Sequence, residues 1–171
     1  MPRGDPSNIN EAGLRYYDNL INELLANGIE PMVTMYHWDL PQALQNWGGF
    51  TNPDIVDYFV NYADLLFRRY GDRVKTWLTF NEPSMVCDAG YGEGFFAPLV
   101  NSPGVGVYIC SHYLLIAHAK TYDLYQAKYK RADGKVGIVI NCGMTWPKDS
   151  NRQQDREAAN TALQFAVRFL F

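Results

Sequence analysis

The spacing of hydrophobic residues changes in a regular way along the chain. Residues 11–27 place apolar side chains three or four positions apart, which predicts an amphipathic helix, and Gly28 follows where glycine commonly ends a helix. Residues 29–36 then form a short apolar run, in which Pro31 is tolerated because it lies near the start. The first predicted elements are therefore a helix and a strand.

The same alternation is repeated further along. Asn52 and Pro53 are typical of a helix N-terminus, and the helical spacing that follows them ends at Gly71. The remaining predicted elements are a strand over 74–80, a glycine-rich loop over 88–106, a helix over about 107–129, a strand over 135–141 and a helix from near Asp155 onward. This order predicts an α/β fold with a parallel sheet and crossover helices. A doubly wound sheet and a (β/α)8 barrel both have it.

The predicted strands are few for a barrel. A (β/α)8 barrel takes about 250 residues or more, whereas this chain has 171. The last predicted helix also reaches Phe171 without a cap or a breaker. We therefore expect residues 1–171 to be part of a larger domain.

Composition and charge narrow the class of protein. Apolar residues make up 47% of the chain, and 9 Phe, 4 Trp and 12 Tyr supply a core, which excludes a disordered chain. The net charge is −3 with no basic run, so we expect no nucleic-acid partner. No apolar run approaches the roughly 20 residues of a membrane span. The first residues lack the apolar segment of a signal peptide, and the compartment stays open.

The cysteines and histidines predict neither a disulfide framework nor a metal site. Cys87, Cys110 and Cys142 are odd in number, far apart and without a CxxC pair. His112 and His118 are six positions apart, which is not the spacing of a helical zinc pair, and we interpret them as helix-packing or surface residues.

Polar and aromatic residues follow the predicted strands. Ligands of parallel α/β folds bind outside the carboxyl ends of the strands, where His37 and Trp38 follow the first strand, Asn81 and Glu82 follow the second, and Asn141 ends the third. A carboxyl beside aromatic residues suits a general acid, an amide suits a sugar hydroxyl, and an indole offers a flat face to a pyranose ring. A salt-bridged glutamate, a turn asparagine and a packed histidine are the structural alternatives.

Two weaker patterns favour ordinary structure. The glycines of residues 89–94 lack the spacing and the following Lys-Ser/Thr of a phosphate-binding loop, so we expect a flexible loop over a pocket. Ser111 lacks the G-x-S-x-G context of a nucleophilic serine.

Three motifs carry a family resemblance. The run 36–42 (YHWDLPQ), then 48–50 (GGF), then 79–83 (TFNEP) resembles glycoside hydrolase family 1, the family of β-glucosidases, lactases and myrosinases. Shorter matches at 29–31, 67–74, 117–119 and 135–138 extend the similarity over essentially the whole chain, in the order of the family.

The resemblance implies a (β/α)8 barrel that hydrolyses β-glycosides with retention and needs neither metal nor organic cofactor. Residues 1–171 would hold strands 3–5 of this barrel and lack strands 1–2 and 6–8. It further implies that Glu82 is the general acid/base, that Asn81 binds the 2-hydroxyl of the glycone, that His37 and Trp38 line the glycone subsite, and that Asn141 faces the aglycone.

The chain departs from the family pattern in one important respect. The nucleophile of the family is a glutamate in a Thr/Val-x-Glu-Asn-Gly motif, and the chain contains no such motif. Retaining hydrolysis needs two carboxyl groups about 5–5.5 Å apart, so we expect the chain alone to be inactive. The alternatives are a truncated form that binds sugar without cleaving it, and an unrelated doubly wound protein with a small-molecule ligand. The sugar, the localisation and the oligomeric state stay open.

Overall fold

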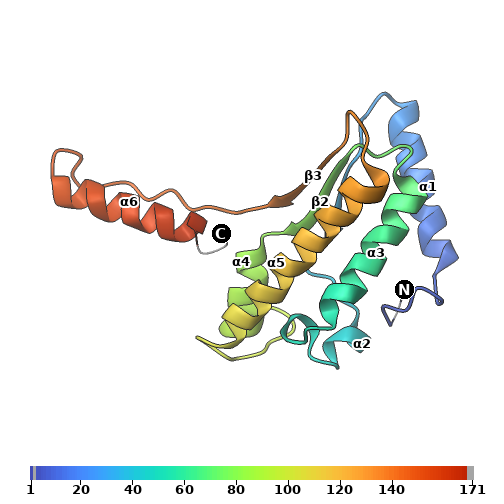
Figure 1. Cartoon of the computed structure of the whole chain (residues 1–171). Coiled ribbons are helices and arrows are strands. Elements are labelled where there is room, and N and C mark those ends of the chain that lie inside the picture. The colour runs from blue at the N-terminus through green and yellow to red at the C-terminus, as the bar shows by residue number, and fades with distance from the viewer. Residues whose placement is uncertain (2, 169–171) are drawn as a thin grey trace. The chain divides into compact units, whose positions relative to one another are not determined.

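A three-stranded parallel sheet forms the centre of residues 1–139 in the computed structural model, which describes residues 1 and 3–168. The strands β1 (Met32–Tyr36), β2 (Thr76–Asn81) and β3 (Lys135–Val139) lie in the order β1–β2–β3 (Figure 1). Tyr36 pairs with Phe80, and Asn81 pairs with Val139. All three strands therefore end at the same edge of the sheet.

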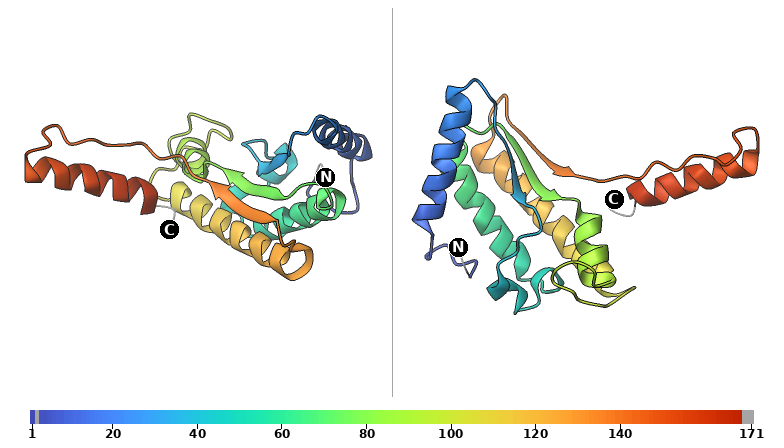
Figure 2. Two further views of the ribbon diagram at one scale, coloured as in Figure 1. Left: turned by 90° about the horizontal axis from the view of Figure 1, so that it is seen from above. Right: turned by 180° about the vertical axis from the view of Figure 1, so that it is seen from behind.

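Helices connect the strands. The long helices of this part are α1 (Glu11–Ala26), α3 (Ile55–Tyr70) and α5 (Gly106–Leu124). Figures 1 and 2 show α3 and α5 side by side over one face of the sheet. The shorter elements are α2 (Gln42–Gln45), the 3-10 turn η1 (Gly49–Thr51), α4 (Pro83–Cys87) and the π-helical turns η2 (Asp88–Gly92) and η3 (Tyr125–Tyr129).

The core lies between β2 and the two long helices. Trp77 and Phe80 of β2 are fully buried. The ring of Phe80 stacks on Phe59 of α3 with centroids 4.2 Å apart, and Trp77 meets Phe67 edge-to-face at 5.1 Å. Such aromatic pairs add about 0.5–1.5 kcal/mol each to the burial of their apolar surface. These contacts fasten β2 to α3.

The predicted order of elements is confirmed, and several boundaries are corrected. Gly28 has φ of +72°, as a helix-ending glycine requires, and Ile29 still donates its N–H to Leu24 O, so β1 begins at Met32 rather than at residue 29. Helix α3 begins at Ile55 because Asn52 Oδ1 accepts from the N–H of Asp54 and closes a turn first.

The glycine-rich loop predicted over 88–106 is wrong in its first part. Helix α4 and the turn η2 continue from residue 83 to residue 92, and most of this stretch is buried. The helix predicted over 107–129 is α5 followed by η3.

Residues 140–168 form a second unit. Its helix α6 spans Gln153–Arg168, and Asp155 near its start accepts a hydrogen bond from the N–H of Asp149 at 3.0 Å. The predicted continuation of this helix to Phe171 lies outside the described residues. Among the described residues, no helix combines the length and the apolar character that crossing a membrane requires.

Candidate active site

Two of the predicted pairs of site residues meet at the carboxyl edge of the sheet. Trp38 Nε1, just after β1, donates a hydrogen bond to the backbone oxygen of Asn81 at the end of β2, at 3.0 Å. The His37 ring lies edge-to-face against Trp38 with centroids 5.5 Å apart. His37, Trp38, Asn81 and Glu82 therefore belong to one edge, although 43 positions separate Trp38 from Asn81 in the chain.

The Trp38 indole is held open to solvent. Its backbone has φ of +73°, and the preceding N–H, that of His37, donates to Asp39 Oδ1 at 3.2 Å. Trp38 is 37% exposed, and its indole stacks on Phe96 with centroids 5.5 Å apart. Trp38 and Phe96 lie on a mainly apolar cleft, whose other lining residues are Tyr36, Met85, Val86, Phe95 and Ala97. Phe96 is not among the predicted site residues, although two consecutive aromatic residues at 95 and 96 in a glycine-rich segment were an available signal.

Glu82 occupies an unusual backbone position. It has φ of 49° and ψ of 67°, the left-handed region, which costs a residue with a side chain on the order of 1–3 kcal/mol. Its N–H donates to Val139 O of β3 at 2.9 Å, and the buried Pro83 then begins α4. Glu82 is thus both the last residue paired with β3 and the residue where the chain turns into a helix.

An irregularity in the pairing of β2 immediately precedes this turn. The register between β2 and β3 shifts between Leu78 and Asn81. Two successive residues consequently face the helices, since Thr79 reaches His118 of α5 while Phe80 stacks on Phe59 of α3.

Thr79 links the strand to α5. Its hydroxyl donates to Gly137 O at 3.2 Å and lies 2.8 Å from His118 Nδ1. Because its single proton is used on Gly137, the hydroxyl accepts from Nδ1–H. Burial lowers the pKa of His118, which keeps this ring neutral. His118 is therefore a packing residue, as predicted, and His112 is exposed.

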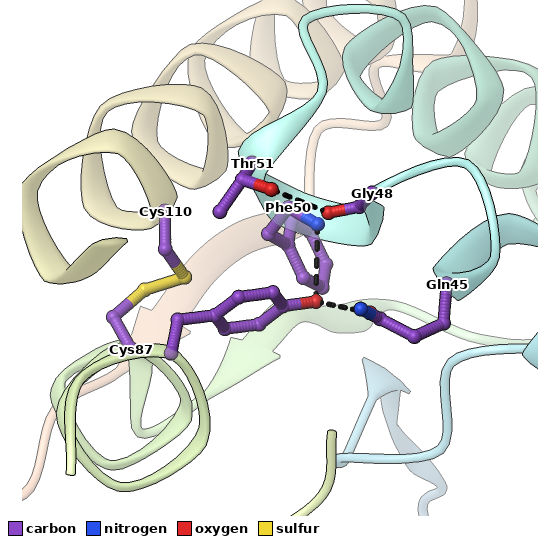
Figure 3. The surroundings of a disulfide bond; sticks show 7 residues. Gln45, Gly48, Phe50, Thr51, Cys87 and Cys110 are labelled. Atoms are coloured by element: carbon purple, nitrogen blue, oxygen red, sulfur yellow. Dashed lines mark hydrogen bonds between the residues drawn. A yellow bond between two sulfur atoms is a disulfide. The ribbon is translucent and has the colours of Figure 1, made fainter. Parts of the chain in front are cut away.

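The prediction of no disulfide is wrong. Cys87, the last residue of α4, is bonded to Cys110 of α5 (Figure 3). The two residues are 23 positions apart, but the packing of α4 on α5 brings their Cα atoms to 5.5 Å, within the range that a disulfide spans. Spacing along the sequence carries no information on this distance. Cys142 is free and exposed.

The segment after Cys87 is anchored rather than flexible, which corrects the prediction for residues 89–94. Tyr91 is 1% exposed, and its hydroxyl donates to Gln45 Oε1 at 2.6 Å and accepts from the N–H of Phe50 at 3.1 Å. Burial raises the pKa of Tyr91 to about 12. Gly49 has φ of +53°, and a Cβ there would collide with the Tyr91 hydroxyl. The GGF run therefore forms part of the support for this segment.

Asn141 is placed differently from the prediction. Strand β3 ends at Val139, so Asn141 lies two positions beyond the strand, in the second unit. Its side chain is exposed. The other four predicted site residues all lie within residues 1–139, at the carboxyl edge of the sheet.

Two carboxyl groups lie at this edge, and that of Asp39 accepts a hydrogen bond from the backbone N–H of His37, whereas Glu82 follows Asn81 directly. Glu82 is half-buried, and no cluster of three or more His, Cys, Asp or Glu that fits a metal ion occurs among residues 1 and 3–168. The arrangement suits proton transfer by Glu82, with hydrogen bonds from the Asn81 amide and the His37 ring and an apolar surface on Trp38.

Known proteins resemble this chain in sequence and in fold over nearly its whole length. The chain is 48% identical to myrosinase 1 of Brevicoryne brassicae over 96% of its length and 49% identical to human lactase/phlorizin hydrolase over 96%. The solved aphid myrosinase superposes with a TM-score of 0.91 at 47% identity over 97% of this chain, and a family 1 β-glucosidase from Thermotoga maritima with 0.87 at 41% over 96%.

The coverage of these relatives is partial. The chain spans 35% of the aphid protein and 9% of the human protein, and 36% of each of the two solved chains. Its sheet and helices are part of a (β/α)8 barrel, which decides between the two architectures that the alternation left open. The sequence model of glycosyl hydrolase family 1 matches residues 1–171, and the chain belongs to this family.

Proposed function

We propose that this chain supplies the acid/base half of the active site of a retaining β-glycosidase. The observation that carries the proposal is the meeting of Glu82, Asn81, Trp38 and His37 at one sheet edge in a family 1 chain. The relatives are named as β-glucosidases, myrosinase and lactase/phlorizin hydrolase, so the proposed substrates are β-glycosides.

The proposed reaction has two steps. Glu82 donates its proton to the glycosidic oxygen as the bond to the anomeric carbon breaks, while a glutamate carboxylate outside this chain bonds to that carbon. Glu82 then removes a proton from water, which attacks the same carbon and releases the sugar with its β configuration. No metal ion or organic cofactor takes part.

Neighbouring residues hold the sugar in this proposal. The Asn81 amide binds the 2-hydroxyl, a contact that strengthens in the transition state. His37 donates to a further hydroxyl and Trp38 lies against the ring of the glycone, while Asn141 faces the aglycone. Phe96 extends the apolar surface beside Trp38.

A segment exchange tests the acid role. Residues 1–171 replace the matching segment of the Thermotoga maritima β-glucosidase, which supplies the rest of the barrel. We expect Glu82→Gln to lower kcat/KM for an alkyl β-glucoside by about a hundredfold or more, because this leaving group needs a proton. The same variant should lower kcat/KM for a 4-nitrophenyl β-glucoside, a good leaving group, by less than tenfold.

A matched substitution controls for the loss of a carboxylate. Glu30→Gln makes the same chemical change at the opposite end of the sheet, where Glu30 lies 3.8 Å from Lys75. We expect Glu30→Gln to leave kcat/KM unchanged for both glucosides. Equal losses for both glucosides in Glu82→Gln would contradict the acid role. A folded exchange protein that binds glucose without cleaving either glucoside would favour the binding-only alternative.

A further inference from the structure

Glu82 needs support on both sides to keep its left-handed backbone. Such conformations persist only where the surroundings impose them. On the side of β2, the N–H of Glu82 is bonded to Val139 O. On the other side lies α4, a helix of five residues. A helix this short is not stable by itself in water. Its far end continues into η2, which the bonds of Tyr91 connect to Gln45 and Phe50, and a second connection joins that end to α5.

The disulfide is the covalent connection of that end to α5. Cys87 is the last residue of α4, and both it and Cys110 are fully buried. Their bond joins the short helix to α5, a helix of 19 residues that packs against α3 and β2. Cys87 is five positions after Glu82 in the chain. Few rotatable bonds therefore separate Glu82 from the cross-link.

A hydrogen bond connects α5 back to β2, the strand that ends one residue before Glu82. Eight positions after Cys110, His118 of the same helix bonds to Thr79, three positions before Glu82. The path from Thr79 along the chain to Cys87, across the disulfide, along α5 to His118 and back to Thr79 is closed. Glu82 is the residue of this closed path whose backbone is left-handed.

We propose that the Cys87–Cys110 disulfide positions Glu82 for proton transfer, by fixing α4 so that the left-handed turn at Glu82 cannot relax. The proposal rests on the acid role proposed for Glu82 above. Without the cross-link, the end of α4 moves relative to α5, the turn relaxes, and the carboxyl group leaves its place beside the leaving-group oxygen. The disulfide acts through Glu82 and touches no substrate.

The test uses the exchanged enzyme and replaces the pair, as Cys87→Ala/Cys110→Ala. We expect kcat/KM for the alkyl glucoside to fall about tenfold, and that for the 4-nitrophenyl glucoside to fall less than about twofold, because misplacement of an acid affects the substrate that needs the acid. Amide hydrogen exchange gives a second readout that needs no activity. The amide of Glu82 should exchange at least about tenfold faster in the pair variant than in the parent, because a relaxed turn releases its bond to Val139 O.

A core substitution at the other end of β2 serves as the matched control. Val74 is fully buried just before β2, and Val74→Ala loses packing without touching α4. We expect Val74→Ala to lower the thermal midpoint. It should leave the ratio of the two kcat/KM values unchanged, and the amide of Glu82 should exchange no faster relative to the neighbouring amides of β2. Cys142→Ser, at the free exposed thiol, controls for the loss of a cysteine.

The outcomes separate this proposal from the one it rests on. If Glu82→Gln affects both glucosides equally, the acid role itself fails. If Glu82→Gln discriminates between them while the pair variant does not and the Glu82 amide stays protected, only the positioning role is overturned. A pair variant that loses its cooperative melt would also overturn it, because the cross-link would then hold the whole fold rather than Glu82.

Discussion

The two ends of the three-stranded sheet are built differently. Where the strands begin, charged side chains pair, and Lys75 lies 3.8 Å from Glu30 and 3.3 Å from Asp133. Where the strands end, Trp38 and Glu82 adopt left-handed backbone conformations that residues with side chains rarely occupy. No ion pair in the described part of the chain involves Glu82.

The start of the strands therefore contributes to stability, whereas their carboxyl end carries the groups suited to chemistry. Paired charges and regular backbone at one end contribute to folding without exposing a reactive group. At the other end, strained backbone presents a carboxyl group and an indole, and the rest of the structure must hold them in place. The same division is general in (β/α)8 barrels, whose active sites lie at the carboxyl ends of the strands.

The largest expected effect concerns the chain in isolation, without the rest of a barrel. Strands β1 and β3 are both sheet edges, and Tyr16, Tyr17 and Met32 are more than half exposed. Open edges and exposed apolar surface favour association and weaken cooperativity. We expect a broad thermal transition by circular dichroism and aggregates on gel filtration. A sharp melt with monomeric elution would show that the edge strands β1 and β3 are stable without further strands beside them.

A smaller effect is expected from Trp38, at the carboxyl end. In the exchanged enzyme, Trp38→Ala should raise KM for the glucosides about tenfold, because it removes the apolar surface proposed to contact the sugar. Trp38→Phe keeps a ring but loses the hydrogen bond to Asn81 O, and should raise KM only a few-fold. Steady-state kinetics on both variants checks this order. Equal KM values for the two variants would contradict the proposed contact between the aromatic ring at position 38 and the sugar.

The smallest effect concerns an ion-pair cluster away from the carboxyl edge. Asp18 of α1 lies 2.7 Å from Arg73 and 2.6 Å from Arg69. We expect Asp18→Asn to lower the free energy of unfolding by about 1–2 kcal/mol, through weaker hydrogen bonds, with kcat/KM unchanged. Lys75→Ala, whose ion pairs are more exposed, should lower it by no more than about 0.5 kcal/mol. Chemical denaturation measures both.

The pH dependence of stability provides a check on Asp18. Burial raises the pKa of this carboxyl, but hydrogen bonds and charges from Arg73 and Arg69 outweigh it and lower the pKa below its usual value of 3.8. The stabilisation is therefore complete above about pH 3.8 and is lost as the pH falls through the lower pKa of the folded state. Asp18→Asn should lack this part of the acid destabilisation. A variant with the parent's acid profile would show that other carboxyl groups dominate.

Local patterns predicted the order of elements well, and boundaries were wrong where side chains compete with the backbone. Gly28 ended its helix as predicted, because only the local backbone conformation is involved. Asn52 closed a turn before α3 began, and residues 88–92 were helical although the glycines of this stretch indicated a loop. Burial of Tyr91 against Phe50 and Gln45 compensates there for the low helix propensity of glycine.

The sequence by itself determined the alternation of strands and helices, the family motifs and the edge at which the candidate residues gather, because these depend on residue type and on short-range spacing. The tertiary structure alone decided the Cys87–Cys110 pairing, the bond from Trp38 to Asn81 and the left-handed turn at Glu82. Each of these depends on distances between segments far apart in the chain. Such distances are set by how helices and strands pack, which no local pattern records.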